Sequence, residues 1–219
     1  MTLHIGMLLF PGLTQLDLTG PFEVFHRIPD TKVHLVWKDL APVRAESGLQ
    51  LVPTTTIADC PPLDVVFVPG GWGQVALMTD DEVLGWLRTH GPRARYVTSV
   101  CTGALVLGAA GLLDGYQATT HWGFTQLLDV FGARLAPGRV VVDRNRITGG
   151  GVTAGIDFAL QVAAEVAGEA TAKAIQLGIE YNPAPPFASG HPDVADPELV
   201  ARLRARFGDV RARLGIAVQ

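Results

Sequence analysis

Several stretches of the sequence are continuous apolar runs, rich in Val, Ile and Leu, that are too short for typical helices. Apolar residues do not alternate with polar ones in these runs, so both faces of each strand are expected to be buried. Strands of this kind are typical of a parallel sheet that is covered on both sides. The predicted strands are residues 3–10, 32–37, 65–68 and 95–100, with shorter ones at 118–120, 139–142 and 146–148.

Segments with helical periodicity separate many of these runs. The alternation of strands and helices predicts an α/β fold, and we expect a three-layer α/β/α sandwich with a mostly parallel central sheet, flavodoxin-like in arrangement. The 219 residues, 48% of them hydrophobic, suffice for one large core, so a single domain over residues 1–219 is predicted. The predicted helices are residues 16–25, 81–89, 102–110, 123–131 and 153–167.

Cys101 stands where the strand at 95–100 turns into the helix at 102–110. Ser99 and Gly103 are small, which lets the backbone bend sharply and lift the thiol above the sheet, as in a nucleophile elbow. The amides and dipole of the helix N-terminus are expected to lower the pKa of the Cys101 thiol. The alternative is a buried cysteine that only packs. Cys60 lies in a Pro-rich turn with no helix after it and is interpreted as structural.

Residues that follow other strands are the ones expected to converge on Cys101, because ligands of an open parallel sheet bind at the carboxyl ends of its strands. Asp17 follows the first strand and is flanked by Leu16 and Leu18. In this apolar setting its pKa is expected to be raised, which suits acid–base catalysis. The alternative is that Asp17 caps the N-terminus of a helix.

Two glycine-rich loops and one histidine complete the predicted site. The backbone N–H groups of Gly71 and Thr102 are expected to form a two-donor site for developing negative charge, unless Gly71 only serves a tight turn. Gly150 permits close approach, either of a substrate or of the following helix, which could pack near the elbow and shift when the cysteine is modified. The alternative is a plain loop before the N-cap residue Thr153. His121 either acts as a base for the cysteine or only lines the pocket.

Composition and spacing exclude several classes of function. The 17 basic and 21 acidic residues give a net charge of −4 without long runs of one sign, which argues against binding to nucleic acid. No segment reaches transmembrane length, and the N-terminus lacks the basic region of a signal peptide, so we expect a cytoplasmic protein with no membrane partner. No His, Cys, Asp or Glu spacing predicts a metal site, and the two cysteines do not form a disulfide framework.

The C-terminal part is predicted to be an ordered Pro-rich loop at residues 181–192 and then a helix near residues 196–214. We expect this helix to pack on its own sheet, on a second subunit, or on both. Because only five residues would follow it, we expect no DNA-binding domain after it. Its apolar stripe comprises Leu199, Leu203, Phe207, Val210 and Leu214.

The motifs described above resemble those of the ThiJ/PfpI proteins, whose fold is similar to that of class I glutamine amidotransferases. The resemblance covers nearly the whole chain. Thr102 stands where the peptidase-like members have a histidine, which argues against proteolysis. The residues that carry the resemblance are 16–21, 59–65, 96–103, 108–113, 118–122 and 149–160.

The resemblance implies a homodimer that hydrates an isocyanide to an N-substituted formamide without a cofactor. It also implies that Cys101 is the nucleophile and Asp17 the acid–base group. The residues fit this chemistry: the thiolate would add to the isocyanide to give a thioimidate, and water would then add with Asp17 as base. The Thr102 hydroxyl is expected to orient Asp17. Residues expected to line the pocket are Trp72, Trp122 and Phe187.

Three alternatives use the same residues. One is an enzyme that acts on 2-oxoaldehydes, as in glyoxalase-like members. Another is a redox sensor in which Cys101 is oxidised to a sulfinic acid. The third is a ligand-binding module without activity, because similar sandwiches occur fused to helix-turn-helix regulators.

Overall fold

A computed structural model describes residues 2–207 of the chain. In this part of the chain the main sheet has seven strands in the order β10-β11-β7-β6-β1-β2-β5. All neighbouring strands are parallel except β10 and β11, which pair antiparallel, so the mostly parallel sheet is confirmed. The strands are β1 (Leu3–Leu8), β2 (Thr31–Trp37), β5 (Thr55–Thr56), β6 (Val65–Val68), β7 (Tyr96–Val100), β10 (Val140–Asp143) and β11 (Arg146–Gly149).

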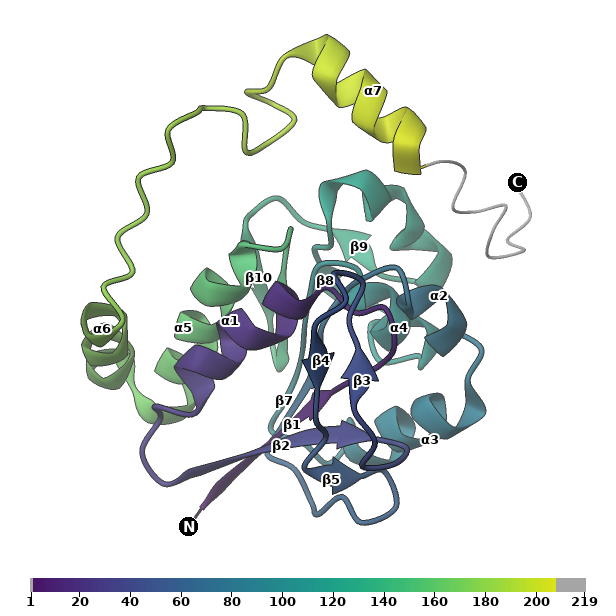
Figure 1. The fold of residues 1–219 in the computed structure, drawn as a ribbon, viewed down its shortest axis with the longest axis vertical. Coiled ribbons are helices and arrows are strands. Elements are labelled where there is room, and N and C mark those ends of the chain that lie inside the picture. Colours follow the sequence, from purple (N-terminus) through teal and green to yellow (C-terminus); the bar gives the residue numbers. More distant parts are fainter. Residues whose placement is uncertain (1, 208–219) are drawn as a thin grey trace.

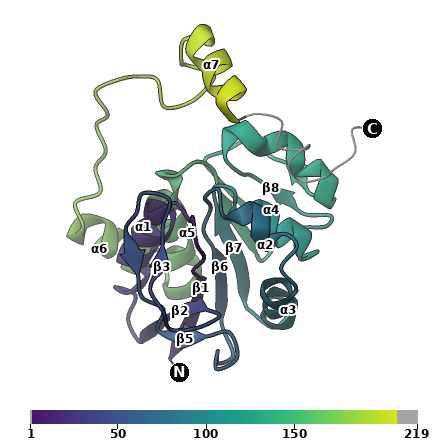
Figure 2. The same ribbon diagram turned by 45° about the vertical axis from the view of Figure 1, so that its right-hand side comes forward.

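Helices cover both faces of this sheet, which confirms the three-layer sandwich (Figures 1 and 2). One face carries α1 (Gln15–Phe25), α5 (Ala154–Ala167) and α6 (Glu169–Gly178), and α5 contacts both α1 and α6. The other carries α2 (Gln74–Leu77), α3 (Asp81–His90) and α4 (Gly103–Ala109). Helices α4 and α5 both contact β7, so the central strand is buried between them.

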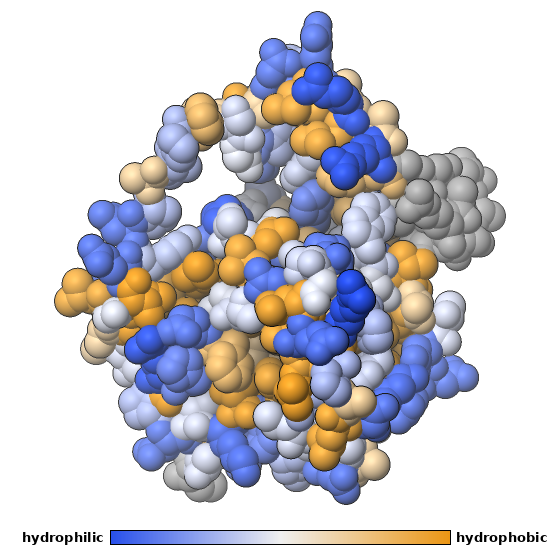
Figure 3. Space-filling model, in the orientation of Figure 1, coloured by the Kyte–Doolittle hydropathy of each residue, from blue (hydrophilic) through white to orange (hydrophobic). Residues whose placement is uncertain are grey.

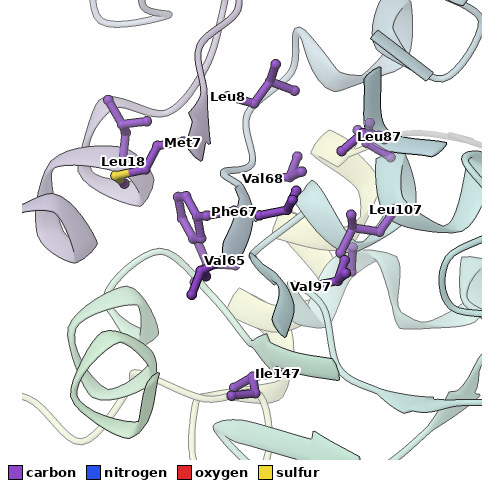
Figure 4. Close-up of a cluster of buried hydrophobic side chains, with 14 of the residues drawn as sticks. Met7, Leu8, Leu18, Val65, Phe67, Val68, Leu87, Val97, Leu107 and Ile147 are labelled. Atoms are coloured by element: carbon purple, nitrogen blue, oxygen red, sulfur yellow. The ribbon is translucent and has the colours of Figure 1, made fainter. Parts of the chain in front are cut away.

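The core lies on both sides of the central strands (Figure 4). Leu18 of α1 lies on one side of β6, and Leu87 of α3 and Leu107 of α4 lie on the other. All four residues of β6 are fully buried, as the unbroken apolar run predicts. On the α1 side the Phe67 ring packs against those of Phe25 and Phe158, with centroids 6.0 and 5.5 Å away.

Smaller elements complete the fold, and they differ most from the sequence-based expectations. The predicted helix at 123–131 is instead two short 3₁₀ helices, η1 (Trp122–Leu127) and η2 (Asp129–Phe131). The segment contains Gly, Thr and aromatic residues, which are weak helix formers, and Gly132 ends it with a φ of 70°. Two small sheets pair β3 (Val43–Arg44) with β4 (Gln50–Leu51), and β8 (Gln117–Ala118) with β9 (Arg134–Leu135).

The last described element is α7 (Pro197–Phe207), which follows a long segment without helix or strand. It lies apart from the sheet (Figures 1 and 2), and its Phe207 packs beside Phe124 of η1, so the alternative of packing on its own sheet does not hold for the described part of the helix. None of its residues is fully buried, and strongly hydrophilic residues gather on it in the space-filling view (Figure 3). The predicted residues Val210 and Leu214 lie outside the described residues.

Among residues 2–207, none of the helices combines the length and the hydropathy needed to span a membrane.

Candidate active site

Cys101 lies at a sharp turn between β7 and α4, as the sequence predicts, with a φ of 52°. A left-handed backbone at a non-glycine residue costs about 1–3 kcal/mol and persists only where the surroundings enforce it. Main-chain hydrogen bonds do so here. The Cys101 N–H donates to the carbonyls of Gly149 and Gly150 at 3.1 and 2.7 Å, and the Thr120 hydroxyl donates to the Cys101 carbonyl at 2.8 Å.

Two glycines leave room for this turn. A Cβ on Gly103 would lie 2.2 Å from the Val68 carbonyl oxygen, so no larger residue fits after Thr102 without a shift of the backbone. A Cβ on Gly70 would lie 2.8 Å from the Cβ of Cys101 and 2.7 Å from Oδ2 of Asp17. The missing side chain of Gly70 therefore lets Asp17 and Cys101 approach each other.

Asp17 lies in the first turn of α1, fully buried, with its carboxyl group against the Cys101 thiol. Its Oδ2 accepts a hydrogen bond from the Gly70 N–H at 2.9 Å, whereas Oδ1 has no partner of this kind within residues 2–207. The N-cap residue of the helix is Thr14, so Asp17 does not occupy the capping position that was the alternative. The structure thus brings together the two residues expected to carry the chemistry.

The environment of this pair raises both pKa values. Burial raises the pKa of Asp17 to about 7, against the opposing hydrogen bonds from the Cys101 thiol and the Gly70 N–H. Burial and then the charge of Asp17 raise the pKa of the Cys101 thiol well above its usual value, against the opposing Thr102 N–H. The expected lowering of the cysteine pKa is therefore wrong. Helix α4 has only seven residues, and burial beside a carboxylate outweighs its dipole.

Thr102 and Gly71 bond to each other rather than to the groups expected from the sequence. The Gly71 N–H donates to the Thr102 hydroxyl oxygen at 3.0 Å, and that hydroxyl lies 3.4 Å from the Gly71 carbonyl oxygen. The predicted bond from Thr102 to Asp17 is thus replaced by one to the Gly71 backbone. The Gly71 N–H already donates to this hydroxyl, so the predicted two-donor site is not formed. Of the two N–H groups, only that of Thr102 faces the Cys101 thiol.

A cavity of about 160 Å³ opens above the thiol. Gly150 does not line it, in contrast to the expectation of a ligand contact: its carbonyl accepts from Cys101 and its N–H donates to the Arg139 carbonyl at 2.9 Å. Gly150 therefore holds the nucleophile turn in place. The residues that line the cavity are Thr14, Glu46, Gly71, Trp72, Gln74, Cys101, Thr102, His121, Phe124, Val152 and Phe207.

His121 lines this cavity with a half-buried imidazole. Its Nδ1 accepts a hydrogen bond from the Gly123 N–H at 3.2 Å, and burial lowers its pKa. The imidazole is therefore neutral near pH 7. Within residues 2–207 no hydrogen bond joins it to Cys101, which favours the interpretation that it lines the pocket rather than serving as the base.

Aromatic rings form one wall of the cavity. The Phe207 ring of α7 lies 5.5 Å from that of Phe124, 6.4 Å from that of Trp72 and 5.2 Å from that of Trp122, between ring centroids. Trp72 lines the cavity as predicted, and Trp122 supports its wall. Phe187 is 78% exposed and is not part of the lining, so that prediction is wrong.

Sequence reasoning missed six lining residues: Thr14, Glu46, Gln74, Phe124, Val152 and, as a site residue, Phe207. Gln74 follows the glycine-rich loop after β6, and its place near a strand end is the signal that could have revealed it. Glu46 accepts a hydrogen bond from the Thr14 hydroxyl at 2.7 Å, and its charge adds slightly to the raised pKa of Asp17. No feature of the sequence places Phe207 at the cavity, because its position there depends on the path of the chain before α7.

Outside the cavity, Cys60 is a half-buried free thiol whose pKa is raised by burial. Within the described part of the chain, no three His, Cys, Asp or Glu side chains are grouped closely enough to hold a metal ion.

Comparisons with known proteins connect this geometry to a family. The DJ-1/PfpI family matches residues 4–165. The chain is 58% identical to an isonitrile hydratase of Pseudomonas putida over 206 residues, which cover 94% of this chain and 90% of that protein. The structure of a ThiJ/PfpI family protein from Pseudomonas syringae superimposes with a TM-score of 0.90 at 45% identity, over 98% of this chain and 88% of that one.

Similarity to a transcriptional regulator is weaker and partial. The helix-turn-helix regulator GbdR of Pseudomonas aeruginosa is 31% identical over 166 residues, which cover 72% of this chain but 45% of the regulator. The match to the hydratase spans nearly both proteins, by contrast. On the family match and this similarity, the chain belongs to the DJ-1/PfpI family.

Proposed function

We propose that this protein is an isocyanide hydratase, which adds water to an isocyanide and releases an N-substituted formamide. Isonitrile is another word for isocyanide, and the relative with 58% identity over 94% of the chain carries that activity in its name. The observation that carries the proposal is the buried pair of Cys101 and Asp17, in which Cys101 lines a small cavity and Asp17 lies against its thiol. A nucleophile and an acid–base group in contact are what this hydration requires.

In the first step, Cys101 adds to the terminal carbon of the isocyanide. The Asp17 carboxylate takes the thiol proton as the S–C bond forms, and then gives that proton to the same carbon, which yields a thioimidate. A carboxyl group with a pKa of about 7 is suited to both transfers near neutral pH, because its two protonation states are similarly populated there. This route starts from the protonated thiol that the raised pKa of Cys101 implies.

In the second step, water adds to the thioimidate carbon. Asp17 takes a proton from the water and passes it to the nitrogen, which gives a tetrahedral species with one OH, one NH and the C–S bond. Asp17 then takes the hydroxyl proton while the C–S bond breaks, and it returns this proton to the departing thiolate. The Thr102 N–H, which faces the sulfur, stabilises that thiolate. Hydration involves no net electron transfer, so the route uses no redox cofactor.

The aromatic wall supports an apolar N-substituent on the substrate. Trp72, Phe124 and Phe207 present ring surfaces to the cavity, and apolar and aromatic groups are bound favourably by such surfaces. We therefore propose aryl or alkyl isocyanides with few polar groups as substrates.

We propose further that the protein is a cytoplasmic homodimer. Leu177 of α6 is 81% exposed, and a contact with a second copy would remove this apolar side chain from water. Catalysis by a free Cys101 thiol is suited to a reducing compartment. Sedimentation of the wild type and of Leu177→Glu tests the dimer, which the charged side chain is expected to weaken.

The redox-sensor alternative finds less support. Sensor cysteines are exposed and have low pKa values, whereas Cys101 is 5% exposed and its pKa is raised.

Formamide production from phenyl isocyanide, followed by chromatography, tests the proposed function. The wild type and the control Cys60→Ala are expected to turn over, whereas Cys101→Ala is expected to be inactive and Asp17→Glu strongly impaired. Methylglyoxal serves as the comparison substrate. Consumption of methylglyoxal without formamide production from the isocyanide would assign the site to the glyoxalase-like alternative instead.

A further inference from the structure

Gln74 is a buried amide for which the described fold provides no partner. It begins α2, directly after the loop that holds Gly70 and Gly71, and it is one of the residues that line the cavity together with Cys101. The residue is 1% exposed. Neither its Nε2 nor its Oε1 has a hydrogen-bond partner within residues 2–207.

Packing alone does not account for an amide at this position. A buried donor and a buried acceptor that bond to nothing destabilise the fold, and an apolar side chain of similar shape would avoid this cost. Leu77 of the same short helix is apolar and buried, as packing requires. Gln74 is therefore better explained by a polar partner that enters the cavity during the reaction.

The chemistry of the reaction indicates which species this partner is. An isocyanide has neither an N–H nor an oxygen, so it offers an amide side chain very little to bind. Once water has added, the bound species carries an oxygen and an N–H group on the same carbon. The side chain of Gln74 presents one donor and one acceptor side by side, which is the complementary arrangement.

We propose that Gln74 binds the hydrated species of the reaction, with Nε2 donating to the oxygen derived from water and Oε1 accepting from the substrate N–H. This inference rests on the proposed isocyanide hydration. An interaction that is formed after water addition and not with the isocyanide stabilises the second step selectively. Gln74 thus acts on breakdown of the thioimidate and leaves its formation largely unaffected.

Gln74→Met tests this, because methionine keeps the length of the side chain and removes both polar atoms. We expect kcat to fall by about 100-fold, the effect typical of losing one buried donor to a reacting oxygen. We also expect KM to fall with it, because the slower step follows covalent addition. Mass spectrometry of acid-quenched enzyme is expected to show the thioimidate, the protein mass plus one isocyanide, in the variant and much less of it in the wild type.

The matched control is Gln161→Met, which removes an amide from the α5 surface, where Gln161 donates to Glu165 at 3.0 Å. It is expected to leave kcat and the adduct level unchanged. The melting temperature of Gln74→Met is expected to equal or exceed that of the wild type, because no bond within the protein is lost. A lower melting temperature together with lost activity and no adduct would assign Gln74 a structural role and overturn the inference.

Equilibrium binding gives a second test that does not depend on turnover. In the Cys101→Ala background, calorimetry with N-phenylformamide is expected to show binding weaker by about tenfold or more when Gln74→Met is added, because two neutral hydrogen bonds are lost. Equal binding would contradict the proposal. A wild type that forms no formamide from isocyanide would refute the proposed function itself, whereas an active wild type matched by an equally active Gln74→Met refutes only the role of Gln74.

Discussion

The burial of Asp17 has two effects: it raises the pKa of the carboxyl group, and it makes the stability of the fold depend on pH. Its carboxyl group contacts the Cys101 thiol and accepts one backbone hydrogen bond from Gly70, which does not offset the cost of burial. The sequence predicts the meeting of Asp17 and Cys101, because both follow parallel strands of one sheet. It could not predict that the Thr102 hydroxyl bonds to Gly71, since that choice depends on sub-ångström positions of two loops.

The pH dependence of stability follows from the raised pKa of Asp17. The folded protein holds this proton up to a pH of about 7, whereas an unfolded aspartate loses it near 3.8. The free energy of unfolding is therefore expected to fall as the pH rises from about 4 to about 7, by about 4 kcal/mol from this group, and to level off above that. Asp17→Asn removes the titrating group. Urea unfolding at a series of pH values is expected to show a flatter profile for the variant, and an unchanged slope would contradict the burial of an uncompensated carboxyl group.

Helix α7 contributes to the wall of the cavity although it is largely exposed. None of its residues is fully buried, yet Phe207 closes one side of the cavity against the rings of Trp72 and Phe124. The long apolar strands were predictable because burial on both faces leaves a clear pattern. Short elements such as β3, β4 and α2 were not, because they have few residues and their conformations depend on contacts distant in the sequence.

Phe207→Ala is expected to weaken binding of aryl substrates without unfolding the protein. Loss of aromatic contacts worth about 1 kcal/mol predicts a several-fold rise in KM for phenyl isocyanide, a smaller rise for methyl isocyanide, and little change in melting temperature. Steady-state kinetics with both substrates measures this. Leu199→Ala, on the same helix and outside the cavity lining, is the control. A large loss of melting temperature would show that α7 supports the core instead.

At the scale of the whole molecule, one core joins the layers of the sandwich. Phe67 of the central sheet packs against Phe25 of α1 and Phe158 of α5, while the other face of the sheet packs on α3 and α4. The layered class was predictable from the alternation of apolar runs and helical segments. The position of α7 was not, because the Pro-rich segment before it carries no periodicity that specifies where it leads.

Phe67→Ala is expected to destabilise the molecule as one unit. Removal of a fully buried phenylalanine typically costs about 3–5 kcal/mol, because contacts are lost and a cavity remains. The prediction of a single domain implies that circular dichroism and tryptophan fluorescence report the same, shifted unfolding midpoint. Two separate midpoints would indicate that the chain contains two independent folding units.

The turn at Cys101 has a consequence for how this scaffold can be redesigned. Its left-handed backbone is held by the carbonyls of Gly149 and Gly150 and by the Thr120 hydroxyl, and all of these bonds go to main-chain atoms of Cys101. The position of the reactive atom is thus set independently of its chemical identity. A serine or a selenocysteine introduced there would be presented at nearly the same point in space, which makes the turn a fixed attachment point for nucleophiles of different reactivity.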